Sequence, residues 1–148
     1  MYRHILIATD GSALAEKAVA HGLSLAKSVG AKVTAIIVEA PFNVYDVPES
    51  KIRQMPQAFE QHAEQIKKHA TRVLSHVADA AKAAGVSCDT VQVENDHPYM
   101  AIITAAKDKG CDLIVMASHG RRGITRLLLG SETVRVLTLS PVPVLVVR

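Results

Sequence analysis

The chain has few aromatic side chains and only a small excess of positive charge. Its 148 residues include no tryptophan, aromatic residues make up 3%, and the formal net charge is +3. Proteins that bind single-stranded nucleic acid stack bases on aromatic side chains along a strongly basic groove. Zinc-finger spacings and RNA-binding aromatic motifs are also missing. We therefore expect no nucleic-acid partner.

Cysteine and long apolar runs are scarce as well. Cys88 and Cys111 form no Cys-x-x-Cys motif, so we expect small core residues rather than a redox pair. No signal or transit segment and no apolar run of about 18 residues is evident. These features predict a cytoplasmic protein with no membrane partner.

The motifs of several common enzyme classes are missing. The sequence contains no Gly-x4-Gly-Lys-Ser/Thr loop, no Gly-x-Gly-x2-Gly fingerprint and no Gly-x-Ser-x-Gly elbow. Ser118 and His119 are adjacent in the chain, which is poor geometry for a nucleophile and its base. We assign no catalytic residue and no metal ligand.

Short apolar runs, typical of buried strands, alternate along the chain with segments whose apolar residues have helical spacing, and 49% of the residues are hydrophobic. Strands are predicted at 4–9, 32–38, 87–93, 113–117 and 142–147, with helices at about 12–30, 58–84, 98–109 and 131–139. This alternation predicts one α/β domain over residues 1–148, a doubly wound, Rossmann-like parallel sheet with helices on both faces. A proline-rich segment, 39–56, is predicted as the longest loop, for which a binding or lid role and a disordered excursion both remain open.

A basic, glycine-rich segment follows the fourth predicted strand. Residues 116–131 read Met-Ala-Ser-His-Gly-Arg-Arg-Gly-Ile-Thr-Arg-Leu-Leu-Leu-Gly-Ser. Glycines let backbone N–H groups close on an anion, and a helix N-terminus adds partial positive charge. The positive side chains around it, set against Glu132, are Arg121, Arg122, Arg126 and Arg135. The segment is typical of a phosphate-binding loop.

Asp10 follows the first predicted strand, as His119 and Gly120 follow the fourth. If those strands are neighbours where the strand order reverses, both loops face one crevice. Asp10 then accepts hydrogen bonds from a ribose or holds a phosphate-bound metal. The alternative is that it only helps Ser12 to cap the first helix.

Three histidines, His62, His69 and His76, recur at seven-residue intervals on the long predicted helix. The interval of two helical turns is too long for one shared metal ion. We interpret them as residues at the boundary of the apolar face. A pH-sensitive contact with a partner is the alternative.

Taken together, these segments resemble the universal stress protein family from end to end. The likeness is carried by residues 5–12, by Val38, by residues 114–120 with Gly130-Ser131, and by residues 140–147. The third piece is similar to the family's ATP-binding signature, Gly-x2-Gly-x9-Gly-Ser/Thr. Ala117 stands at its first glycine, which is acceptable if the residue has a negative φ.

The resemblance implies strand order 3-2-1-4-5, ATP in the crevice with Mg²⁺, and a homodimer joined through the last strand, from Val142 to Val147. It assigns adenine and ribose to Ala8, Thr9, Asp10 and Val38, and the facing wall to Met116, Ala117, His119 and Gly120. It assigns backbone and hydroxyl donors for the phosphates to Gly130, Ser131, Glu132 and Thr133. The Glu132 carboxylate is awkward there, so we expect its backbone N–H to act.

The resulting hypothesis is an ATP-binding regulatory protein of the stress response, whose nucleotide occupancy changes loop order or the choice of an unknown protein partner. A slow ATP hydrolase is a second hypothesis, although no water-activating pair is evident. The third is an interaction module that works without nucleotide, which the alanine at position 117 favours.

Overall fold

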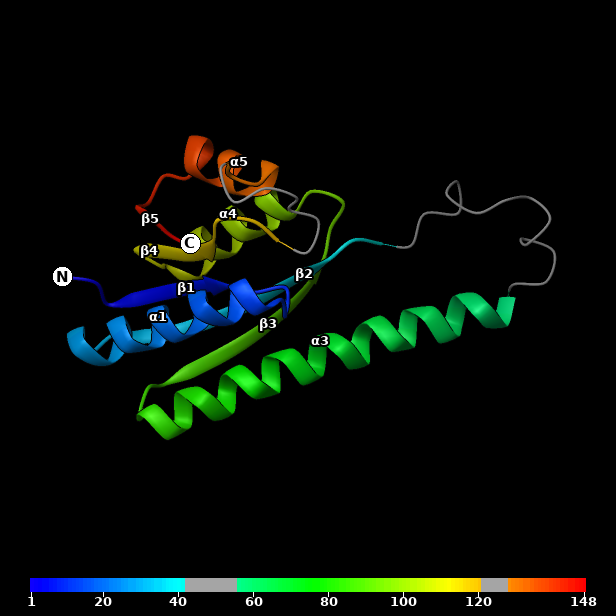
Figure 1. The fold of residues 1–148 in the computed structure, drawn as a ribbon, viewed down its shortest axis with the longest axis horizontal. Helices are drawn as coiled ribbons and strands as arrows, with labels where there is room; N and C mark the ends of the chain where they lie inside the picture. The colour runs from blue at the N-terminus through cyan, green and yellow to red at the C-terminus, as the bar shows by residue number, and fades with distance from the viewer. Residues whose placement is uncertain (42–55, 121–127) are drawn as a thin grey trace.

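A five-stranded, all-parallel sheet in the order β3-β2-β1-β4-β5 forms the centre of the molecule (Figure 1). The computed structural model describes residues 1–41, 56–120 and 128–148. Most of the predicted loop at 39–56 lies outside these residues, as do Arg121, Arg122 and Arg126. The observed order confirms the predicted fold class.

Nine elements alternate along the described chain. The strands are β1 (His4–Ala8), β2 (Lys32–Glu39), β3 (Cys88–Glu94), β4 (Leu113–Ala117) and β5 (Val144–Val147). The helices are α1 (Ala13–Val29), α3 (Pro56–Ala84), α4 (Pro98–Lys109) and α5 (Ser131–Leu139). Helices α1 and α3 cover one face of the sheet, and α4 and α5 cover the other.

Successive side chains of the inner strands supply both apolar clusters, because strand residues alternate between the two faces of a sheet. Ile5 and Ile7 of β1 enter the cluster beneath α1 and α3, whereas Leu6 enters the cluster beneath α4 and α5. All three side chains are fully buried. Burial on both faces explains why these strands read as unbroken apolar runs.

Local signals fix the ends of α1. The Ser12 hydroxyl accepts a hydrogen bond from the Ala15 N–H at 3.2 Å, as an N-cap side chain does. At the other end Gly30 adopts a left-handed conformation with φ of 71°, and its N–H donates to the Ala26 carbonyl. The Ser12 cap thus fixes where α1 begins after the turn that follows β1, and Gly30 ends the helix before β2.

Two element boundaries differ from the prediction because of proline. The last strand begins at Val144 instead of Val142, since Pro141 and Pro143 have no N–H for the ladder. The Pro143 carbonyl still accepts from the Ile114 N–H at 3.0 Å. Conversely, Pro56 is the first residue of α3 rather than part of a loop, because the first turn of a helix tolerates proline.

The two cysteines are both free and lie on opposite faces of the sheet. Cys111 is buried under α4, and burial raises the pKa of its thiol to about 11. Cys88 is half-buried on the α1–α3 face. Cys111 is therefore a core residue, as predicted, whereas Cys88 lies half-buried at the edge of its apolar cluster.

The carboxyl ends of β1 and β4 lie side by side, because these strands pair directly through Ile5–Leu113, Leu6–Ile114 and Ile7–Val115. The chain runs outward from β1 to β2 and β3 on one side and from β4 to β5 on the other. The strand order therefore reverses between β1 and β4, where ligands of open parallel sheets bind.

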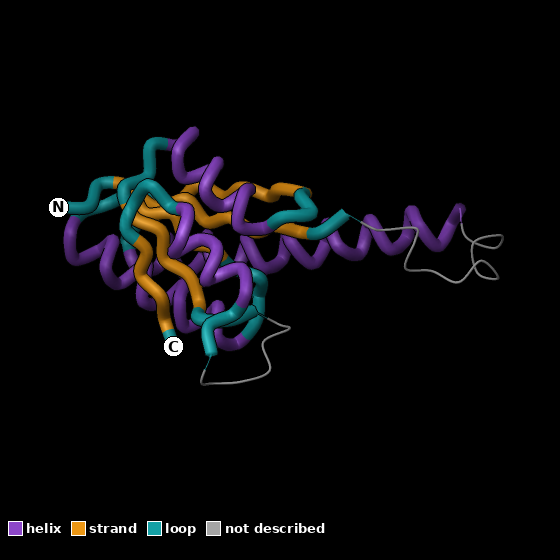
Figure 2. The backbone as a smooth tube through the Cα atoms, turned by 90° about the horizontal axis from the view of Figure 1, so that it is seen from above, coloured by secondary structure: helices purple, strands orange, loops and turns teal. Residues whose placement is uncertain are grey.

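Figure 2 shows α3 extending beyond the sheet. None of the described helices is both long and apolar enough to cross a membrane.

Candidate functional site

A crevice of about 530 Å³ opens at the carboxyl ends of β1, β2 and β4. Its size lies within the usual range for small-molecule sites, about 300–1,000 Å³. All twelve residues predicted to hold nucleotide line this crevice. They are Ala8, Thr9, Asp10, Val38, Met116, Ala117, His119, Gly120, Gly130, Ser131, Glu132 and Thr133.

Gly130 brings the start of α5 against the end of β4. Its N–H donates to the Ser118 carbonyl at 2.8 Å. A Cβ atom at position 130 would lie 3.1 Å from the His119 Cα atom and 3.4 Å from the Ser118 carbonyl oxygen. Only glycine fits this approach without displacing backbone. The first N–H groups of α5, which have no intrahelical acceptor, therefore open onto the crevice.

A buried hydrogen bond from Thr133 also joins α5 to β4. Its side chain is 2% exposed, and its hydroxyl donates to the Ala117 carbonyl at 3.0 Å. The family resemblance implied hydroxyl donors for phosphate at this turn. In the structure the Thr133 hydroxyl proton is committed to Ala117, so the residue faces a ligand with its backbone.

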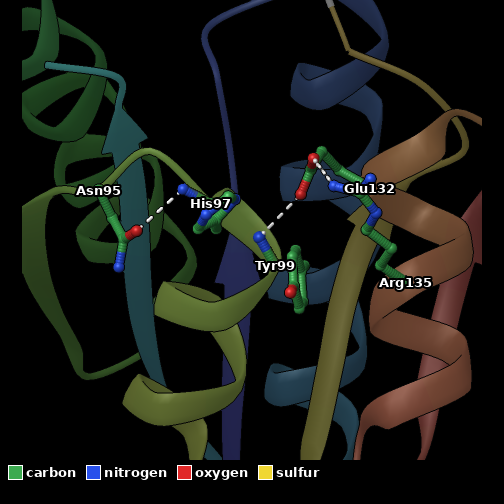
Figure 3. A network of polar contacts seen from close by, with 5 residues as sticks. All are labelled: Asn95, His97, Tyr99, Glu132 and Arg135. Atoms are coloured by element: carbon green, nitrogen blue, oxygen red, sulfur yellow. Dashed lines mark hydrogen bonds and ion pairs between the residues drawn. The ribbon is translucent and has the colours of Figure 1, made fainter.

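Glu132 turns its carboxylate toward α4. Its Oε2 accepts a hydrogen bond from the Tyr99 N–H at 2.9 Å, and its Oε1 lies 3.3 Å from Arg135 Nη1 (Figure 3). The Arg135 guanidinium also lies 5.3 Å from the centre of the Tyr99 ring. The N-cap residue of α4, His97, makes no side-chain capping bond. Glu132 supplies that missing acceptor from a neighbouring helix.

Asp10 performs the helix-start role that the sequence considered for it, and it also lines the crevice. Its Oδ1 accepts from the Ser12 N–H at 2.9 Å, which supports the start of α1. Its Oδ2 faces the other loop, since a Cβ atom at Gly120 would lie 2.7 Å from that oxygen. Asp10 thus lines the crevice while bracing the β1–α1 turn.

Ala117 meets the backbone condition set by the sequence. No non-glycine residue in the described ranges has a positive φ. Ala117 is 8% exposed and belongs to the apolar cluster on the α1–α3 face. The alanine at this signature position therefore needs no strained backbone.

The crevice has a further wall that the sequence prediction missed. Part of it is apolar, with Ile36 from β2 and Pro98 and Ile102 from α4, and part is acidic, with Glu39 and Asp96. Ala15 and Ala40 complete the lining. Asp96 follows β3 and could have been found, because all parallel strands end at the same edge of the sheet. Pro98 and Ile102 required knowledge of where α4 packs.

Comparison with known proteins assigns the chain to a family. The sequence profile of the Universal stress protein family matches residues 1–148. The chain belongs to the universal stress protein family. It is 32% identical to the universal stress protein YxiE of Bacillus subtilis over 149 residues, covering 100% of both chains.

Solved structures of the family share this fold. MJ0577 of Methanocaldococcus jannaschii superposes with a TM-score of 0.80 at 28% identity, covering 99% of this chain and 96% of MJ0577. A universal stress protein in complex with cAMP superposes with a TM-score of 0.72 at 25% identity, covering 99% and 97% of the two chains. Other solved members with the same fold are complexes with dAMP, from Archaeoglobus fulgidus, and with AMP, from Arabidopsis thaliana.

Proposed function

We propose that the crevice binds ATP and that nucleotide occupancy regulates a contact with a protein partner in the stress response. The observation that carries the proposal is the junction of β4 and α5, where Gly130 brings helix N–H groups to the edge of the crevice. Family members in complex with adenine nucleotides support the ligand class.

The crevice lining offers both kinds of surface that a nucleotide needs. Ile36, Val38 and Ile102 offer an apolar surface for a base, whereas Gly130 and Ser131 present the positive end of α5 to phosphate. Asp10, which also lines the crevice, would accept hydrogen bonds from the ribose.

Mg²⁺ would enter with the phosphates rather than through a protein cage. The described residues contain no group of three or more histidine, cysteine or acidic side chains able to hold a metal. This suits Mg²⁺, which keeps several waters and takes few protein ligands. We propose that phosphate oxygens and water coordinate the ion, which would neutralise phosphate charge.

We also propose that residues 1–148 form a single domain, that the protein is a homodimer, and that it is located in the cytoplasm. We propose that two chains pair through β5, whose outer edge has no neighbouring strand among the described residues. Two free cysteines support a reducing compartment such as the cytoplasm.

The test is calorimetric titration of ATP and AMP, with Mg²⁺, into the wild type and Gly130→Asp. A side chain at Gly130 would press on His119, and its charge would repel phosphate. An acidic residue at the start of a helix stabilises that helix, so the fold should persist. We expect the affinity for ATP to fall at least about a hundredfold. This corresponds to a loss of about 3 kcal/mol of binding free energy, which is the cost of placing an unpaired charge against an anion.

Thr138→Asp is the matched control, because it adds the same charge near the exposed far end of α5. It should leave ATP affinity unchanged. Equal ATP affinity in wild type and Gly130→Asp would refute the proposed site. Failure of the wild type to bind either nucleotide would instead favour the interaction module.

A further inference from the structure

A second hollow of about 520 Å³ is lined by residues of α1 and α3. These two helices lie on the opposite face of the sheet from α4 and α5 (Figure 1). The lining of this hollow and that of the nucleotide crevice have only Thr9 in common among the described residues. We call it the α1–α3 groove. It is as large as the crevice, and the proposed function does not use it.

The interior of the groove is apolar. Val19 and Leu23 of α1 face Val73 and Val77 of α3 across it. Val19, Leu23 and Val77 are at most 7% exposed. Ala20 and Ala80 contribute only methyl groups to the two walls, so an aromatic or short acyl group would find space between the helices.

The rim of the groove on α3 is basic. His69, Arg72 and His76 line it at intervals of three and four residues, which places them on one side of the helix. Two of the three histidines with seven-residue spacing thus belong to the groove. Within the described part of the chain, the Arg72 side chain makes no hydrogen bond or ion pair. Glu16 of α1 also lines the hollow without pairing with Arg72.

We propose that the α1–α3 groove binds a small amphipathic anion, with an apolar body between the helices and a carboxylate, sulfonate or phosphate head at Arg72. The Arg72 guanidinium selects this class, because it is a permanent cation on the rim that forms no ion pair among the described residues. A planar guanidinium suits such head groups, since it donates two parallel hydrogen bonds. Burial of the apolar body supplies the rest of the affinity.

The probe for this site is anilinonaphthalene sulfonate, an amphipathic anion whose fluorescence rises in apolar surroundings. Ala20→Trp should fill the groove from an exposed position of α1 and abolish binding. Ala83→Trp is its control, because Ala83 is also exposed on a helix but does not line the groove. Unchanged probe affinity in Ala20→Trp, or no binding by the wild type, would overturn the proposal.

The charge is tested with Arg72→Gln. The dissociation constant for the sulfonate probe should rise about fivefold, as for loss of one partly exposed charged contact. The affinity for neutral phenylnaphthylamine, which lacks the sulfonate, should not change. Lys68→Gln, an exposed cation of α3 outside the groove, is the control. Equal effects of Arg72→Gln on both probes would contradict recognition of the anionic head.

A final measurement separates the groove from the nucleotide crevice. With excess Mg-ATP present, the probe should still bind, and its affinity in Gly130→Asp should equal that in the wild type. Displacement of the probe by ATP would place it in the crevice and refute the groove. This outcome is distinct from a failure of ATP itself to bind.

Discussion

His4 is a buried titratable residue in β1, the strand that ends at the crevice. Its side chain is 6% exposed, and its Nε2 lies 2.7 Å from the Thr34 hydroxyl oxygen of the adjacent strand. Burial lowers the pKa of His4 below its ordinary value, and the nearby Lys32 cation acts in the same direction. The folded protein therefore favours the neutral ring.

This lowered pKa makes stability depend on pH. The unfolded chain, with an ordinary histidine pKa of about 6.5, binds the proton more readily than the folded chain. The stabilisation is thus complete above about pH 6.5 and is lost as the pH falls through the interval down to the folded-state pKa. Urea unfolding of wild type and His4→Gln at about pH 8 and about pH 5.5 tests this.

We expect the wild type to lose more of its free energy of unfolding between these two pH values than His4→Gln, because glutamine can bond to Thr34 but does not titrate. The difference between the two proteins isolates His4 from the other histidines. Identical losses would show that His4 titrates alike in the folded and unfolded chains.

At the residue scale, sequence motifs correctly placed at the crevice those residues that lie close together in one loop. Gly130 and Gly120 were found because glycine marks close backbone approach. The destination of a side chain was harder to predict. The hydrogen bonds that Thr133 donates to Ala117 and that Glu132 accepts from Tyr99 join residues that only the packed helices bring together.

At the scale of elements, the link from α5 to α4 fixes two walls of the crevice. The Glu132 carboxylate accepts from the Tyr99 N–H in the first turn of α4, where a negative charge is also favoured by the helix dipole. His97 provides no side-chain cap there. Glu132 therefore acts as the cap of α4.

Replacement of Glu132 tests this link. Glu132→Ala should lower the free energy of unfolding by about 1 kcal/mol, as loss of an N-cap does. Glu132→Gln should lower it less, because the amide oxygen still accepts from Tyr99. Both are measured by urea unfolding. Arg135→Ala is the control, since its exposed ion pair should contribute little. An equal loss in Glu132→Gln and Glu132→Ala would rule out the capping bond.

The helices and strands were largely predictable. Along most of the chain, the spacing of apolar residues indicates the same elements as the glycines and prolines that mark their ends. The exceptions have local causes. Pro141 and Pro143 delay β5, and Pro56 opens a helix that the sequence placed two residues later. The α1–α3 groove was beyond prediction, because it depends on the separation of two helices distant in sequence.

At the scale of the whole molecule, β5 is an edge strand with an exposed apolar side chain. Leu145 is 39% exposed, and β5 pairs only with β4 in the described structure. If two chains pair through this strand, Leu145→Asp should convert a dimer to a monomer in sedimentation velocity. Val29→Asp is the control, since Val29 is similarly exposed, at 38%, but ends α1. A wild-type monomer, or a dimeric Leu145→Asp, would contradict pairing through β5.

The whole molecule has two hollows with different chemistry, one on each side of the β1–α1 turn. The crevice offers backbone N–H groups and acidic side chains at the reversal of strand order, whereas the groove offers an apolar interior with a basic rim. Thr9 lines both. Nucleotide binding in the crevice is the claim on which the proposed regulation depends.

The most direct test is to purify the full chain without added nucleotide, denature it, and identify the small molecules released by mass spectrometry. The crevice geometry predicts an adenine nucleotide, ATP or ADP, in near-equal amount to the wild-type protein and none from Gly130→Asp. An empty wild-type protein that also fails to bind added Mg-ATP would contradict a nucleotide-dependent function.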